Sequence, residues 1–163
     1  LHAMKVSELQ ELYINELKSL LPEWKFVKSH RHFKLKQGND VVWFLHVSCI
    51  NHDSDFDAVG SVAVEYLSGK QRVCIIGAEL GNIEGRGQTR FPVSTSGEAV
   101  SSAKQLYNFF VQIGLPFLNK FSDLNMVVSV LRGGGKNAML ISPFTTQHEE
   151  QIKNLCQTYS VGM

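Results

Sequence analysis

Several features that usually mark a functional class are missing from this sequence. The net charge is only +1, with 16 basic and 15 acidic residues, so the composition gives no reason to expect nucleic acid or an anionic membrane as a partner. No run of about 18 apolar residues is present, so no membrane-spanning helix is predicted. The beginning of the chain lacks a basic segment followed by an apolar one, and no signal peptide is predicted either.

Cysteine is scarce as well, and its distribution argues against a disulfide framework. Cys49, Cys74 and Cys156 lie far apart, and none belongs to a CxxC pair. An odd and scattered set of this kind is typical of a reducing compartment. We therefore expect a cytoplasmic protein, with Cys49 as a buried and inert thiol on a strand.

Signatures of catalysis and of nucleotide binding are absent too. The chain has no GxSxG motif for a serine nucleophile. Residues 85–90 begin like a dinucleotide-binding glycine loop, but Arg90 occupies the sixth position and no βαβ pattern surrounds it. Residues 133–136 lack the spacing and the Ser/Thr of a phosphate-binding loop. The sequence therefore predicts no cofactor, and it leans away from an enzyme without excluding one.

Two groups of candidate metal ligands are present, but both depart from known sites. Asp53, Asp55 and Asp57 stand at alternate positions, as at the start of a calcium loop. Such a loop needs glycine and glutamate where this chain has Ala58 and Val64. A zinc site would have to be assembled from separate strands and turns by these residues: His30, His32, His46, His52 and Asp53. We predict no metal, because the sequence has no HxxxH or HExxH helix.

What the chain does contain is a series of strand patterns. Residues 41–50, 56–67 and 73–78 are rich in β-branched and aromatic side chains, and Gly, Asn, Asp and Ser separate them. This pattern predicts adjacent antiparallel strands joined as hairpins. Residues 24–36 alternate apolar and charged side chains, which predicts two further strands. The result is a meander of about five strands, with Gly60 as a candidate bulge.

Helical patterns precede and follow these strands. Residues 5–21 repeat apolar side chains at three- and four-residue steps and stop at a proline. After residue 95 come patterns for several helices, the first ending at Gly114 and the last opening near Thr146. We therefore predict one α+β domain over residues 4–163, with the N-terminal helix and the C-terminal helices packed on one face of an antiparallel sheet. Leu1-His2-Ala3, which precedes Met4, is interpreted as an expression scar.

Between the strands and the later helices, the periodic pattern disappears. Residues from Gly81 to Gly97 are rich in glycine and carry Arg86 and Arg90. We expect a long mobile loop here, and loops beyond about a dozen residues usually bind or close over something. This loop is the first candidate for a site, with its two arginines available to an anion.

A basic cluster lies on the early strands. A sheet face that combines lysines with aromatic rings can stack the bases of a nucleic acid. The residues concerned are Lys25, Lys28, Arg31, Lys34 and Lys36, together with Trp24 and Phe33. Lysines also protect the edge of a sheet against unwanted pairing, and this second interpretation is the one we favour.

The order of features resembles a bacterial family known as domain of unknown function 4304. The resemblance lies in a Leu-Pro-x-Trp-x-Phe entry to the first strand, in the strand pair from Phe33 to Ser48, and in the segment from Gly114 to Leu124. It covers about residues 7 to 135 and consists of apolar patterns, without catalytic residues to transfer. The resemblance implies an α+β fold and a bacterial, cytoplasmic setting. Because similar domains are often encoded near toxin or defence systems, it also suggests an immunity-type binder.

The sequence leaves two principal functions open and disfavours nucleic-acid binding. The first is a non-enzymatic binding module that contacts a toxin-like protein partner through an open sheet face and the Gly81–Gly97 loop, with an acidic surface meeting a basic partner. The alternative is a small-ligand or anion-binding protein, or an enzyme, with its site under that loop. The candidate binding residues for these functions are Arg86, Arg90, His46, His52, Asp53 and Asp55.

Overall fold

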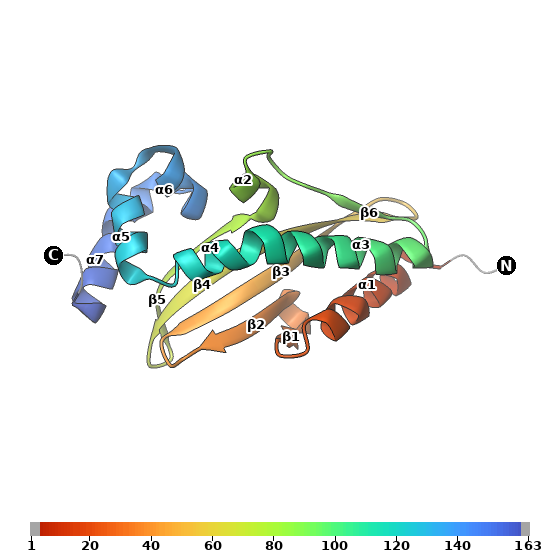
Figure 1. Ribbon diagram of the computed structural model, residues 1–163, viewed down its shortest axis with the longest axis horizontal. Coiled ribbons are helices and arrows are strands. Elements are labelled where there is room, and N and C mark those ends of the chain that lie inside the picture. The colour runs from red at the N-terminus through yellow and green to blue at the C-terminus, as the bar shows by residue number, and fades with distance from the viewer. Residues whose placement is uncertain (1–3, 161–163) are drawn as a thin grey trace.

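A helix, an antiparallel sheet and a second set of helices follow one another along the chain (Figure 1), in a computed structural model that describes residues 4–160. This order confirms the predicted α+β class. The strands are β1 (Lys25–Val27), β2 (His32–Gln37), β3 (Val41–Asn51), β4 (Phe56–Ser68), β5 (Gln71–Glu79) and β6 (Phe91–Val93). The predicted expression scar, Leu1 to Ala3, lies outside the described residues.

The sheet is the predicted meander with one strand added. Strands β1 to β5 pair antiparallel in sequence order. The short strand β6 pairs with Phe56, Asp57 and Ala58 of β4, on the side opposite β3. Gly60 pairs regularly with Val47, and the irregularity in β4 lies between residues 66 and 67, so the predicted bulge at Gly60 is wrong.

The helices and helical turns have the following bounds in chain order. They are α1 (Val6–Leu20), η1 (Lys28–His30), α2 (Leu80–Glu84), α3 (Ser96–Phe109), η2 (Phe110–Gly114), α4 (Leu115–Lys120), α5 (Leu124–Gly133), α6 (Gly135–Ile141), η3 (Thr145–Gln147) and α7 (His148–Tyr159). Among the described residues, none of these helices combines the length and the apolar character needed to cross a membrane.

One face of the sheet packs against the helices and forms the core. In Figure 1, α3 and α4 cross in front of the strands, and α1 lies against α3. Trp43, Leu45 and Val47 alternate along β3 and are all buried in the core. From α1, the ring of Tyr13 meets the ring of Phe56 edge-on, with centroids 5.7 Å apart. The alternation of buried side chains fixes which face of the sheet each strand residue occupies.

The helix predicted to end at Gly114 continues through it. Segments α3, η2 and α4 form one long helix, with a π turn at η2. Pro116 has no N–H to donate, and a proline within a helix usually breaks the hydrogen-bond pattern. Here the pattern widens just before the proline, since the Leu115 N–H bonds to the carbonyl of Phe110, five residues earlier. Gly114 is therefore a close-packing residue: an added Cβ would lie 2.7 Å from Cδ1 of Phe110.

The predicted mobile loop from Gly81 to Gly97 is also largely ordered secondary structure. It contains most of α2 and the whole of β6. An added Cβ at Gly81 would lie 2.0 Å from the carbonyl oxygen of Gly87 and 2.6 Å from the amide nitrogen of Thr89. The returning backbone thus passes directly over the start of α2, and this contact requires glycine.

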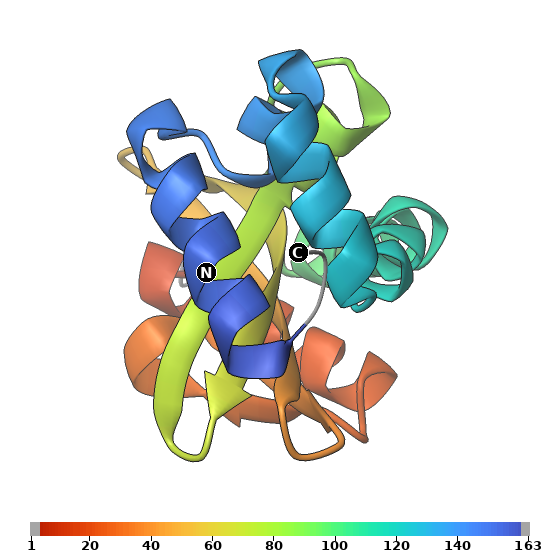
Figure 2. The same cartoon turned by 90° about the vertical axis from the view of Figure 1, so that its left-hand side faces the viewer.

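The last helices gather at one end of the molecule, which faces the viewer in Figure 2. Helices α6 and α7 both contact β5, and α5 contacts α7. The Tyr159 hydroxyl donates to the Leu67 carbonyl at 2.5 Å, and the Tyr66 hydroxyl donates to the Phe121 carbonyl. These bonds attach the end of α7 and the residue after α4 to strand β4.

Candidate functional site

The second face of the sheet, which we call the open face, is formed by the alternate residues that do not enter the core. It can be followed as rows of partners across the strands. One row joins Lys34, Phe44, Ala63 and Gly77. A second row joins His32, His46, Ser61 and Glu79, and a third row joins Lys36, Val42, Glu65 and Ile75. None of the apolar side chains in these rows belongs to the core cluster that the helices complete.

Apolar side chains stand at two places on the open face, with His46, Ser48 and Ser61 between them. Phe44 and Ile50 on β3 are half-buried, and Val59 on β4 is only 2% exposed. The Phe44 ring also contacts the His32 ring, with centroids 4.7 Å apart. Because Phe44 and Ile50 are only half-buried, both keep apolar surface in contact with water.

Charged side chains border the region around Phe44, with opposite signs on opposite sides. Lys25, Lys34 and Lys36 stand on β1 and β2, whereas Glu65 stands on β4 and Glu79 on β5. The acidic side is compensated within the chain. Arg72 Nε lies 2.6 Å from Glu65 Oε2, and Gln88 donates to Glu79. A face with both signs of charge suits a surface with both signs better than it suits a polyanion.

Two histidines stand between the basic and acidic sides. His32 and His46 are cross-strand partners, and His30 stacks on His32 at 5.3 Å between ring centroids. Burial lowers the pKa of His32, and the charges of its neighbours, first His30 and His46, lower it further. Burial and the nearby Arg31 guanidinium lower the pKa of His46. Both rings therefore favour the neutral form.

These histidines do not complete a metal site. Within residues 4–160, no three His, Cys, Asp or Glu side chains are arranged to hold a metal ion. His46 Nδ1 lies 3.2 Å from the hydroxyl oxygen of Ser48. The zinc set considered from the sequence is divided, since His52 lies at the β3–β4 hairpin, at the other end of β3 from the pairing with β2.

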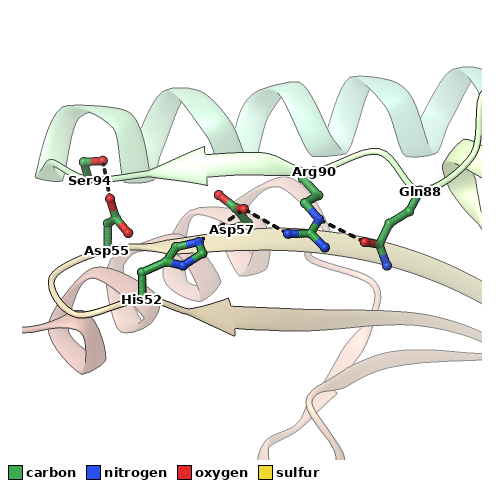
Figure 3. Close-up of polar contacts among 6 residues, drawn as sticks. All are labelled: His52, Asp55, Asp57, Gln88, Arg90 and Ser94. Carbon is green, nitrogen blue, oxygen red and sulfur yellow. Dashed lines mark hydrogen bonds and ion pairs between the residues drawn. The ribbon is translucent and has the colours of Figure 1, made fainter.

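A polar network extends the open face at that hairpin (Figure 3). Its centre is Asp57, whose Oδ2 lies 3.4 Å from His52 Nε2 and 3.6 Å from Arg90 Nη1. Arg90 Nε also donates to Gln88 Oε1 at 2.9 Å. Beside this network, the Ser94 hydroxyl donates to Asp55 Oδ2 at 3.3 Å. The network joins the β3–β4 hairpin to the segment around β6.

The structure thus brings some of the candidate residues together and separates others. His52 and Arg90 meet at Asp57, Asp55 bonds to Ser94 beside them, and His46 lies further along the same face. Asp53 lies at the exposed hairpin tip. Arg86 pairs with Glu84 at 3.4 Å, away from the network. Since Arg86 and Arg90 both have carboxylate partners, an anion would have to compete with those partners for either side chain.

The basic and aromatic side chains of the early strands are separated by the sheet. Lys25 and Lys34 pair with each other on the open face, whereas Phe33 is fully buried in the core. Trp24 packs against Phe110 on the helical side, with ring centroids 5.5 Å apart. The aromatic residue that does reach the open face is Phe44. The sequence did not reveal that Phe44 lies on this face, because β3 is apolar at almost every position and its two faces have the same apolar pattern.

No reactive thiol accompanies the site. Burial raises the pKa of the Cys49 thiol, and burial raises the pKa of Cys74 to about 11. A catalytic cysteine needs the opposite shift, toward the thiolate. In the network around Asp57, each named carboxylate already has a partner.

Comparisons with known proteins add no relative: no family model matches the chain, and neither a curated protein nor a solved structure does. The resemblance to domain of unknown function 4304 therefore stays a prediction from sequence patterns.

Proposed function

We propose that this chain is a non-enzymatic binding module that presents the open face of its sheet to a protein partner. The observation that supports this function is an apolar patch of Phe44, Val42 and Ala63, left out of the core and bordered by charges of both signs. Protein interfaces have this anatomy, with an apolar centre and a polar rim. The immunity-type role, in which the partner is a toxin, follows from the sequence resemblance by analogy.

The charges favour a protein over a nucleic acid. Lys25, Lys34 and Lys36 would attract phosphates, but Glu65 and Asp57 lie on the same face. Single-stranded nucleic acids bind along positively charged grooves with several aromatic platforms. Among the alternating residues of β1 to β5 on this face, Phe44 is the only Phe, Tyr or Trp.

A pair of matched substitutions tests the proposal. Phe44→Glu places a charge in the apolar patch of the open face, and Val111→Glu places the same charge at an exposed position on the helical side. Chemical cross-linking in the native cells should capture the same protein with the wild type and with Val111→Glu, and lose it with Phe44→Glu. Circular dichroism of both variants confirms that they fold.

Two results would refute this function. One is a cross-linked partner that is retained equally by all three proteins, which would place the contact elsewhere. The other is no cross-linked partner for the wild type at any stage of growth. Substitution of a residue at the centre of an interface typically reduces the binding free energy by at least about 2 kcal/mol, which is roughly thirtyfold in affinity.

A further inference from the structure

A groove on the far side of β1 from the open face is lined mainly by polar and basic residues. It has a volume of about 470 Å³ and lies between α1 and the segment from β1 to Arg31. Its lining from α1 comprises Ser7, Gln10, Glu11, Ile14, Asn15 and Lys18, and its lining from the other side comprises Phe26, Lys28 and Arg31. The six α1 residues follow the helical repeat and form one stripe.

Three cations converge on this groove without carboxylate partners. Lys18, Lys28 and Arg31 contribute three positive charges, and Glu11 is the single acidic residue in the lining. None of the three cations forms an ion pair with a carboxylate of the described residues. The Lys18 ammonium instead lies 5.2 Å from the centre of the Phe26 ring. Arg72, Arg86 and Arg90 differ in this respect, because each is paired.

Arg31 is held in place by Gln10, a buried polar residue. Gln10, only 8% exposed, accepts a hydrogen bond from Arg31 Nη2 at 3.1 Å and donates to Asn51 Oδ1 at 2.6 Å. The side-chain amide of Gln10 therefore fixes the position of the Arg31 guanidinium. Arg31 also has a left-handed backbone with φ of 51°, which is unfavourable for a residue with a Cβ. The bond from the Val47 N–H to the Arg31 carbonyl, at 3.0 Å, holds the backbone in this conformation.

We propose that this groove binds a small organic oxyanion, either a phosphate monoester or a carboxylate attached to an apolar body. The Arg31 guanidinium presents a planar fork that matches either head group, and Lys28 and Lys18 add point charges. Ile14 and Phe26 supply apolar contact for the body of the ligand. This site uses none of the open-face residues, so it stands independently of the proposed protein-binding function.

Isothermal titration with three probes tests the site and identifies its head group. Phenyl phosphate, benzoate and inorganic phosphate are titrated into the wild-type chain at low salt. At least one of the two aromatic probes saturates, and it binds more tightly than inorganic phosphate because its ring contacts Phe26 and Ile14. Tighter binding of phenyl phosphate assigns a phosphate monoester, and tighter binding of benzoate assigns a carboxylate.

Matched variants separate this site from general attraction between charges. Arg31→Asn keeps a residue that tolerates the left-handed backbone, and Lys28→Gln removes one charge. Each weakens binding about tenfold, as expected for a hydrogen bond to a charged group. Lys70→Gln removes the same charge at the exposed β4–β5 turn and leaves binding unchanged, as does Phe44→Glu on the open face.

Either of two outcomes overturns the proposal. The first is the absence of saturation by both aromatic probes up to about 10 mM, the limit of useful affinity for a small-molecule site. The second is a mutational pattern that does not follow the groove, in variants whose melting temperature stays within about 3 °C of the wild type. In that pattern, Lys28→Gln and Lys70→Gln weaken probe binding equally, or Arg31→Asn does not weaken it at all.

Discussion

At the scale of single residues, two histidines on the open face favour the neutral form. His32 and His46 occupy the boundary between lysines and carboxylates, and both have a pKa below the ordinary value of 6.5. Burial is the largest cause for each ring. When a histidine has a lower pKa in the folded state than in the unfolded state, the unfolded chain binds protons more readily as the pH falls. The folded state is then destabilised relative to the unfolded state.

This linkage predicts a stability that depends on pH in a defined direction. Above about pH 6.5 both rings are neutral in the folded and unfolded chains, so they do not reduce stability. As the pH falls below that value, the unfolded state binds protons before the folded state does, and the free energy of unfolding decreases. Urea unfolding should therefore give a lower stability at about pH 5.5 than at about pH 7.5.

The double variant His32→Gln, His46→Gln identifies the source of this change. It should lose less stability than the wild type over the same pH interval, and His52→Gln, at an exposed site, serves as the matched control. An identical loss in the wild type and the double variant would assign the pH dependence to other groups.

At the scale of elements, glycine decides how the segment after β5 folds. Gly81 and Gly114 were read from the sequence as loop and helix-end residues, and both are positions where elements touch. At Gly81 two of the three closest atoms belong to the backbone of Gly87 and Thr89, which cannot rotate away as a side chain can. The return from α2 toward β6 depends on this contact.

The matched pair Gly81→Ala and Gly133→Ala tests the role of that contact. Gly81→Ala should destabilise the fold by about 3 kcal/mol, the upper end of the usual cost of overpacking. Gly133 ends α5 and has no atom within 4 Å of an added Cβ, so Gly133→Ala should change stability by less than about 1 kcal/mol. Chemical denaturation measures both, and equal effects would mean that the α2 return adjusts easily.

At the scale of the whole molecule, the C-terminal helices are joined to the sheet by a few specific bonds. Trp43 Nε1 donates to the Ser122 hydroxyl at 2.7 Å, just before α5 begins. Tyr159, at the end of α7, donates to the Leu67 carbonyl, and Leu155 and Cys156 are buried in the common core. Because the core is continuous, the helices and the sheet should unfold together.

Thermal unfolding followed by two probes measures this cooperativity. Circular dichroism reports mainly on the helices, and the fluorescence of Trp24 and Trp43 reports on the sheet side of the core. The two transitions should coincide in the wild type. Tyr159→Phe removes one hydrogen bond and should lower stability by about 1 kcal/mol without separating the transitions. An earlier loss of helical signal would show instead that α5 to α7 form a separate unit.

The sequence predicted the strands well because their side chains alternate or are β-branched, and such patterns depend on neighbours along the chain. The meander of β1 to β5 and the boundaries of α1 follow this rule. Prediction from the sequence failed at Gly60, Gly81 and Gly114. In a sequence, a glycine that allows close packing cannot be told from one that ends a helix or makes a bulge. The arginines of the candidate site illustrate the same difficulty. Arg86 and Arg90 were visible in a glycine-rich segment, while Arg31 was hidden among other basic residues of an early strand pair.

By itself, then, the sequence determined the α+β class and the order of the strands, because local periodicity and turn residues specify elements and their nearest pairings. Only the tertiary structure decided which side of the apolar strand β3 meets the helices and leaves Phe44 on the open face. It alone also decided that Arg31 forms no ion pair with a carboxylate among residues 4–160, while Arg90 is paired with Asp57. Both outcomes depend on distances between residues remote in sequence, and no pattern of neighbours along the chain encodes such distances.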